Sequence, residues 1–512
     1  MSLKSATASV PVLSGLALWG AGLLLAGANF MAVLDTSIAN VSVTNIAGSL
    51  GASTSQGTWV ITSYAVAEAI TVPLTGWLAG RFGAVRTFAF AIIGFGIFSA
   101  LCGFAPTLGS LVFFRVMQGL CGGPLMPLSQ TLLVTIFPPK QQPAAMGLWA
   151  VTTLVGPIFG PIMGGTLCDS LGWGSIFWVN IPVALLCGPL VLRVLSRHET
   201  PTAKVKVDSI GLALLVVWVG ALQVMLDLGK DRDWFASPLI VGLAAAAAIG
   251  FTAFLIWELT AANPIVNLKV FRRRGYSVAL LTLSLTIGAF FATNVLTPLW
   301  LQTNMGYTAT WAGYVGGMIG ILAIVSAPIT SRLLTLVDPR LIVSVAIAWI
   351  AGITLMRSGA TSQMDFWSIA VWLLFAGAGL PMFFLPLTTM ALGDVKPEET
   401  ASAAGLMSFV RTLSGAVATS IVTTVWENGA SRNQADLAGA MGNTQGTLDI
   451  LTAGGMSAAQ AVGNVTQMVQ SQAVMLATNQ VMFASALIFV AAAAAIWLAP
   501  RPSRAVDASA AH

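Results

Sequence analysis

Long hydrophobic stretches, interrupted by short polar or charged segments, follow one another along almost the entire chain. Residues 87–114, 141–168 and 234–257 contain no Asp, Glu, Lys or Arg, and residues 275–331 form a charge-free run long enough for two helices. A helix needs about 20 mainly apolar residues to cross a bilayer. The pattern therefore predicts about fourteen transmembrane helices, near residues 13–40, 55–79, 87–105, 108–136, 144–168, 174–195, 208–226, 236–257, 277–302, 308–332, 340–357, 366–392, 401–427 and 478–499.

The composition agrees with this prediction and excludes several classes of protein. Of the 512 residues, 56% are hydrophobic and only 8% are charged, against roughly 25% in an ordinary soluble domain. Disordered and nucleic-acid-binding proteins carry far more charge. The chain has four scattered cysteines, two histidines and no GxxxxGK[ST] nucleotide-binding loop. We therefore expect an all-α integral membrane protein that is not an enzyme and needs no metal, no cofactor and no nucleic acid.

Lysine and arginine positions predict how the chain is oriented in the membrane. With fourteen helices, 17 of the 23 basic residues fall on the side of the N-terminus, and Lys230, Arg232, Arg357 and Arg432 fall on the other. Basic residues concentrate in cytoplasmic loops, so we expect both termini in the cytoplasm. The 17 residues are Lys4, Arg81, Arg86, Lys140, Arg193, Arg197, Lys204, Lys206, Lys269, Arg272, Arg273, Arg274, Arg332, Arg340, Lys396, Arg501 and Arg504.

The helices divide into three groups, which suggests an internal repeat. Residues 1–206 contain six predicted helices, residues 207–274 a pair, and residues 275–512 six more. The segment 76–86 (GWLAGRFGAVR) is weakly echoed by PITSRLLTLVDPR at 328–340, at the corresponding place in the second half. Many transporters are built from such repeats. The polar segment 428–475 is expected on the outer side, either as a flexible loop or as a partly helical one.

Four ionisable residues fall inside predicted helices, where a charge costs roughly 2.5–3.5 kcal/mol on insertion scales. Asp35 and Arg115 are expected at similar depth, so they can pair. Either the pair is a static structural feature, or Asp35 alternates between a protonated state and a state paired with Arg115. The second hypothesis is favoured because buried ion pairs are not reliably stabilising.

Glu68 and Arg411 are the other two such residues. Glu68 is predicted close to the membrane midplane, where burial favours its neutral form. Either Glu68 or Asp35 could carry the proton, and the alternative for Glu68 is a hydrogen-bonded acid that fixes helix packing. Arg411 could reach the interface by snorkelling, and a structural or gating role is predicted for it.

Glycine and proline are unusually dense in the fifth predicted helix, at residues 156–165 (GPIFGPIMGG). Glycines at four-residue spacing let two helix backbones touch, whereas prolines remove hydrogen bonds and bend the helix. The pattern therefore indicates either simple helix packing or a bend at a moving interface. Two similar stretches, at 122–127 and 377–386, are candidates for lining a central cavity.

Several of these strings are similar to motifs of the fourteen-helix drug:proton antiporters of the major facilitator superfamily. LDTSIANV at 34–41 resembles the first-helix motif, and GWLAGRFGAVR the loop motif after the second helix. FFRVMQGL at 113–120 looks like the fourth-helix motif, and 156–165 like the antiporter motif GPxxGPxxGG. Proton coupling is predicted for Asp35, Glu68 and Arg115: burial within the membrane points to the two acids, and the resemblance implicates the arginine in proton transfer. The resemblance assigns conformational roles to Gly76, Arg81, Gly83, Arg86, Gln118, Gly119, Gly156, Pro157, Gly160, Pro161, Gly164 and Gly165.

The resemblance covers nearly the whole chain, so it implies both a fold and an activity. The implied fold is the major facilitator fold, extended by the central helix pair. The implied activity is proton-coupled export of hydrophobic or amphipathic drugs across a bacterial inner membrane. It also implies a periplasmic membrane-fusion adaptor of the EmrA type and a TolC-like outer-membrane channel, with segment 428–475 as a docking element. A proton-coupled importer and a non-transporting scaffold are the alternatives.

The chain departs from the family pattern at Gly80. The family's loop motif usually has an acid just before its first arginine, and here that place is a glycine. A charge network at this loop would therefore use other groups, for example Arg81 and Arg86 with helix C-termini.

Overall fold

A computed structural model describes residues 14–52, 54–139, 141–203, 208–262, 264–396, 399–441 and 444–501. The regular secondary structure in these ranges is helical, and twelve helices are long and apolar enough to cross a membrane. Two further helical columns, at residues 54–82 and 142–171, pack in the same bundle. The predicted all-α membrane architecture is therefore confirmed.

We call the first ten helices the N-terminal half, the next two the central pair and the last seven the C-terminal half. Proline shapes two of the columns, because it has no N–H to donate. A 3₁₀ turn at Val72–Leu74, which contains Pro73, separates α3 from α4, and Pro124 lies between α6 and α7. The bounds are α1 (Gly15–Ser49), α2 (Thr54–Gly57), α3 (Trp59–Thr71), α4 (Thr75–Phe82), α5 (Ala84–Gly103), α6 (Leu108–Gly122), α7 (Leu125–Ile136), α8 (Gln142–Leu171), α9 (Ser175–Trp178), α10 (Asn180–Leu195), α11 (Ser209–Leu228) and α12 (Pro238–Thr260).

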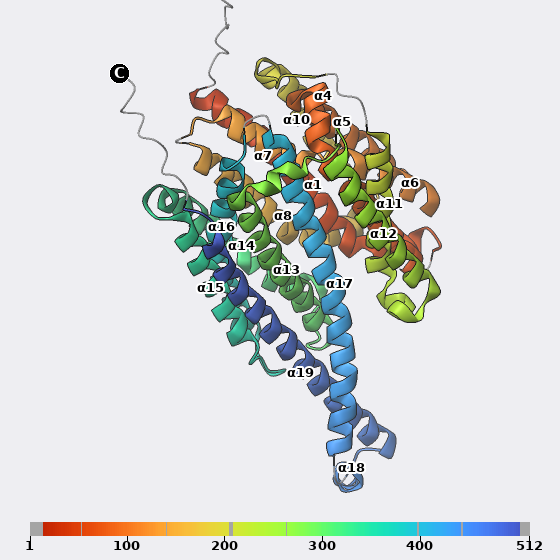
Figure 1. Ribbon diagram of the computed structural model, residues 1–512. Coiled ribbons are helices and arrows are strands. Elements are labelled where there is room, and N and C mark those ends of the chain that lie inside the picture. Colours follow the sequence, from red (N-terminus) through yellow and green to blue (C-terminus); the bar gives the residue numbers. More distant parts are fainter. Residues whose placement is uncertain are drawn as a thin grey trace, which may run out of the picture.

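The last seven helices form the C-terminal half, which lies beside the N-terminal half in Figure 1. They are α13 (Arg274–Thr303), α14 (Ala309–Leu336), α15 (Pro339–Arg357), α16 (Phe366–Gly393), α17 (Thr400–Ala440), α18 (Thr444–Ala453) and α19 (Ala458–Ala495). The central pair packs on both halves, since α11 contacts α3 as well as α17.

Most of the polar segment 428–475 is helical in the described residues, so of the two alternatives the partly helical one is correct. At 1.5 Å per residue, the 41 residues of α17 span about 60 Å, roughly twice the hydrocarbon thickness of a bilayer. α19 runs back beside α17, and α18 lies at the tip of this extension (Figure 1). Trp426 Nε1 donates to Thr478 Oγ1 at 2.9 Å and joins the two helices. The sequence left the choice between loop and helix open, because Ala, Gly, Asn and Gln weaken the apolar signal.

One end of the bundle gathers most of the basic residues and is called the basic end. Arg274 Nε donates to the Leu498 carbonyl oxygen at 3.0 Å, and Arg340 Nη1 to that of Ala499 at 3.1 Å. These bonds bring the starts of α13 and α15 to the end of α19. Of the basic residues expected on this side, Lys4, Lys140, Lys204, Lys206 and Arg504 lie outside the described residues.

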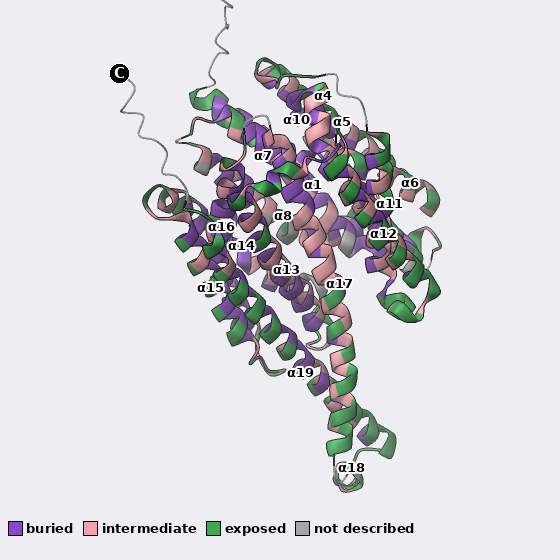
Figure 2. Ribbon diagram, viewed as in Figure 1, coloured by how far each residue is buried: buried purple, intermediate pink, exposed green. Residues whose placement is uncertain are grey.

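Contacts between the halves occur towards the basic end. A Cβ at Gly76 of α4 would lie 2.7 Å from the Cα of Ser402 in α17. The rings of Trp149 in α8 and Phe384 in α16 stack with centroids 5.5 Å apart. Figure 2 shows buried residues where helices meet, whereas the α17–α19 extension is mostly exposed or intermediate. The two halves are therefore in close contact near the basic end.

Candidate functional site

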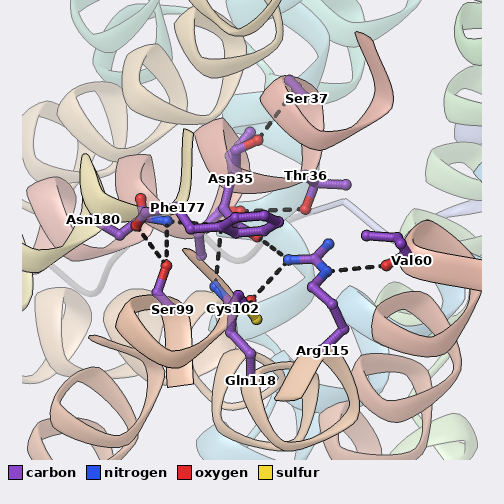
Figure 3. Close-up of polar contacts among 12 residues, drawn as sticks. Asp35, Thr36, Ser37, Val60, Ser99, Cys102, Arg115, Gln118, Phe177 and Asn180 are labelled. Atoms are coloured by element: carbon purple, nitrogen blue, oxygen red, sulfur yellow. Dashed lines mark hydrogen bonds and ion pairs between the residues drawn. The ribbon is translucent and has the colours of Figure 1, made fainter. Parts of the chain in front are cut away.

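An ion pair between α1 and α6 forms the centre of the candidate site (Figure 3). Arg115 Nη1 lies 2.6 Å from Asp35 Oδ2, and each side chain is only 1% exposed. The pairing predicted from helix depth is therefore present. A buried charge is tolerated when it is paired and its remaining donors and acceptors are satisfied, so the surroundings of both groups matter.

Asp35 accepts hydrogen bonds from two further buried side chains. Gln118 Nε2 donates to Asp35 Oδ1 at 3.0 Å, and Asn180 Nδ2 donates to the same oxygen at 2.7 Å. Asn180 also donates to Ser99 Oγ, which in turn donates to the Phe177 carbonyl oxygen at 2.7 Å. The carboxylate therefore has three side-chain donors from two elements, α6 and α10.

Arg115 is held from several sides as well. Its Nε donates to the Val60 carbonyl oxygen at 3.0 Å, and its Nη1 also donates to Gln118 Oε1 at 2.8 Å. Its Cζ lies 4.2 Å from the centroid of the Tyr64 ring, which is a cation–π distance. The guanidinium is thus fixed between α1, the Val60 and Tyr64 turn of α3, and its own helix.

Small residues let α3 and α6 approach closely enough to build this site. A Cβ at Gly119 would lie 2.5 Å from the Tyr64 carbonyl oxygen and 2.9 Å from Ala67 Cβ. A Cβ at Gly123 would lie 2.8 Å from Thr71 Cβ. Real Cβ atoms do not come so near, so glycine is required at both positions. Gly119, which the fourth-helix motif includes, therefore acts through packing.

The glycines of α8 pack on the α1 backbone around Asp35. A Cβ at Gly156 would lie 2.7 Å from Val33 Cγ1, and one at Gly160 would lie 3.2 Å from the Ile38 nitrogen. Gly164 faces the Ile38 carbonyl oxygen, whereas nothing lies within 4 Å of a Cβ at Gly165. α8 is one continuous helix, and the side chains of Pro157 and Pro161 lie outside the described residues. The stripe thus forms a close helix contact, and the structure leaves open the hypothesis that this contact moves.

Glu68 and Arg411 lie away from the Asp35 network. Glu68 is half-buried on α3 and, in the part of the chain that the structure describes, makes no hydrogen bond. It interacts electrostatically with Arg411 of α17 and with Arg115. Arg411 Cζ lies 5.9 Å from the Trp149 ring centroid and 6.0 Å from that of Phe384. Arg411 is therefore at the contact between the halves.

The acid that the loop motif after α4 lacks at Gly80 is replaced by Glu199, which comes from a different segment of the chain. Glu199 accepts hydrogen bonds from the Val85 nitrogen at 2.9 Å and the Arg86 nitrogen at 3.0 Å, at the start of α5. Its Oε2 is 3.9 Å from Arg86 Nε. Gly83 has a φ of 93°, and a Cβ there would clash with the Glu199 carboxylate. The partner of Arg86 is thus Glu199, whereas the sequence predicted a helix C-terminus.

Arg81, the other arginine of this loop motif, packs against aromatic rings. Its Cζ lies 5.8 Å from the ring centroids of both Trp77 and Phe82. Both rings belong to α4, so this contact holds the arginine against its own helix.

Sequence reasoning missed Asn180, Ser99 and Glu199. Asn180 and Ser99 are single polar residues inside apolar runs, which is a weak signal, and Asn180 is 145 positions from Asp35. Glu199 is an acid among basic residues at the end of the sixth predicted helix. An isolated acid among basic residues could have indicated a partner for the arginines of the loop motif.

Comparison with known proteins gives a consistent result over most of the chain. Residues 25–419 match the Major Facilitator Superfamily. The chain is 42% identical over 480 residues to multidrug export protein EmrB of Escherichia coli (strain K12), which covers 93% of this chain and 94% of that protein. It is 41% identical over 497 residues to fatty acid resistance protein FarB of Neisseria gonorrhoeae, covering 96% and 98%.

A solved structure shares the fold. The crystal structure of a bacterial homolog to the human lysosomal transporter Spinster, in an inward-facing and occupied conformation, aligns with a TM-score of 0.52 at 16% identity. The alignment covers 96% of this chain and 100% of that one. The fold that the motifs predicted is confirmed, and the chain belongs to the Major Facilitator Superfamily of transporters as an EmrB-like member.

Proposed function

We propose that this protein is a proton-coupled multidrug exporter that exchanges hydrophobic or amphipathic drugs for protons by alternating access. The printed names of its relatives, multidrug export protein and fatty acid resistance protein, support export of toxic amphipathic compounds. In this proposal residues 1–206 and 275–512 are the two moving halves, and residues 207–274 are the central pair that links them.

The observation that carries the proposal is the buried network around Asp35. Its carboxylate has three donors and almost no exposure, so a proton that binds there must displace the ion pair with Arg115. Protonation would free the guanidinium and loosen the contact between α1 and α6. The α8 glycines lie directly behind this turn of α1, so a change at Asp35 acts on a helix of the transport path.

Glu68 is the second candidate proton carrier. It has no hydrogen-bond donor among the described residues, and its electrostatic partner Arg411 belongs to the other half. A proton on Glu68 would weaken the attraction between the halves next to the stacked Trp149 and Phe384. We therefore assign Arg411 a gating role and propose that Glu68 couples protonation to separation of the halves.

The available energy is sufficient for this exchange. One proton that moves down about 100 mV releases roughly 2.3 kcal/mol. At about 1.36 kcal/mol per tenfold concentration ratio, this sustains a gradient of about fifty-fold for a neutral drug. ATP hydrolysis is not required.

We place the protein in a bacterial inner membrane, with the basic end and both termini in the cytoplasm. The gathering of arginines at one end supports this orientation. The α17–α19 extension then projects into the periplasm, where it would dock an EmrA-like adaptor that leads to a TolC-like channel. Its length beyond the bilayer supports the docking role.

The test is drug-triggered proton release from proteoliposomes with an acidic interior. Addition of hydrophobic drugs outside should release protons from vesicles that contain the native protein, and Asp35→Asn should abolish this release. Asp436→Asn is the matched control, because Asp436 is an exposed acid on the distal part of α17. Undiminished release in Asp35→Asn would refute the role of Asp35, and co-movement of drug and protons would indicate an importer.

A further inference from the structure

Two further arginines, Arg340 and Arg357, are buried in the C-terminal half. Arg340 forms an ion pair with Asp338, and Arg357 has no acidic partner among the described residues. It is the last residue of α15 and is only 8% exposed. Its place at the end of a predicted helix put it among the basic residues on the side opposite the N-terminus, but its side chain is buried in the bundle. Within the described ranges, no Asp or Glu forms an ion pair with it.

Arg357 lines a small pocket enclosed by α13, α14, α15 and α16. The polar part of the wall consists of Thr293, Asn294, Thr297 and Thr354, and the remainder is apolar, including Ile319 and Leu380. Arg357 Nη2 donates to the Thr297 hydroxyl at short range. The pocket lies within the C-terminal half, towards the end of the bundle opposite the basic end.

Most of the N–H groups that remain available to a ligand in this pocket belong to Arg357. The threonine hydroxyl protons are used within their own helices, since Thr293 donates to the Phe290 carbonyl oxygen, Thr297 to that of Thr293 and Thr354 to that of Ile350. Arginine has five N–H donors and stays charged. A buried positive charge with one neutral acceptor is strongly unfavourable unless an anion accompanies it.

We propose that this pocket binds a small monovalent anion, either chloride or the carboxylate group of an organic acid, against the Arg357 guanidinium. The bound anion would be the negatively charged partner of Arg357 that the described residues do not supply. Chloride and a carboxylate present the same acceptor chemistry to the guanidinium, and the experiment separates them. The proposal does not depend on proton coupling, so binding alone tests it.

The experiment follows the thermal unfolding of the purified protein in lipid nanodiscs by tryptophan fluorescence. Sodium chloride or sodium acetate replaces sodium sulfate at constant ionic strength. The native protein should show a saturable rise in Tm with one or both anions. Arg357→Gln should raise the midpoint concentration at least tenfold. Arg432→Gln is the matched control, because it removes an exposed arginine of α17 and should leave the midpoint unchanged.

The outcomes distinguish chloride from a carboxylate as the ligand, or show that the pocket binds no anion. A saturable, Arg357-dependent response to chloride alone identifies an inorganic anion, and a response to acetate identifies a carboxylate site. Equal responses of the native protein and Arg357→Gln to both anions overturn the proposal. If Arg357→Gln does not fold, Ala376→Leu keeps the arginine but fills the pocket, and it should abolish the response in the same way.

Discussion

Arg115 of the N-terminal half and Arg357 of the C-terminal half are both buried, but their charges have different partners. In the N-terminal half, the first helix supplies a carboxylate, and Asp35 lies 2.6 Å from Arg115. In the C-terminal half, the first helix supplies only the Thr297 hydroxyl to Arg357. The internally paired charge is suited to accept a proton, because protonation changes the pair. The unpaired charge is suited to accept an anion from outside the chain.

The largest expected effect comes from removing one member of the N-terminal pair. Arg115→Met leaves Asp35 buried without its cation and should lower the free energy of unfolding by about 3–5 kcal/mol. Thermal unfolding in detergent measures this loss as a fall in Tm. The double variant Asp35→Asn/Arg115→Met should recover much of the stability, because the uncompensated charge is gone. A double variant as unstable as the sum of the single ones would mean that the two groups do not interact.

A second change makes the C-terminal half resemble the N-terminal half. Thr297→Asp places a carboxylate on the first helix of that half, next to Arg357. A charge-assisted hydrogen bond contributes about 1.5–3 kcal/mol, so Tm should rise and the response to chloride should disappear. Thr303→Asp, at the exposed end of the same helix, is the control and should change neither. A lower Tm with an intact chloride response would show that Arg357 does not need an anionic partner.

The sequence predicted the paired arginine but not the unpaired one, and the reason is physical. Asp35 and Arg115 are opposite charges at similar depth inside apolar runs, and this is why the sequence indicates that they can pair. Arg357 comes at the end of a predicted helix, where a side chain can reach solvent or turn inward. That choice depends on how α13 and α15 pack, which a single sequence does not contain.

The same distinction explains the other outcomes. Helix number, the glycine stripe of α8 and the pairing of Asp35 are encoded in local patterns of charge, hydropathy and spacing. Asn180 and Glu199 act at positions distant in sequence, and their contacts arise only when helices assemble. For the α17–α19 extension the sequence left loop and helix open, because a polar helical hairpin outside the bilayer lacks the apolar pattern that predicts membrane spans.

The smallest expected effect tests whether close packing behind Asp35 sets the N-terminal site apart. Gly160→Ala would bring a Cβ into a clash with Ser37 Cβ and within 3.0 Å of the Ser37 carbonyl carbon, and overpacking of this kind costs about 1–3 kcal/mol. Gly165→Ala is a matched control on the same helix, because nothing lies within 4 Å of its Cβ, and alanine favours a helix by up to about 1 kcal/mol. Tm should therefore fall for Gly160→Ala and stay equal or rise for Gly165→Ala. Drug-triggered proton release should decline only in Gly160→Ala, since only that glycine touches the turn of α1 that carries Asp35. Equal Tm values and equal proton release in the two variants would mean that the α1–α8 contact accommodates an extra methyl group and does not hold the Asp35 carboxylate in place.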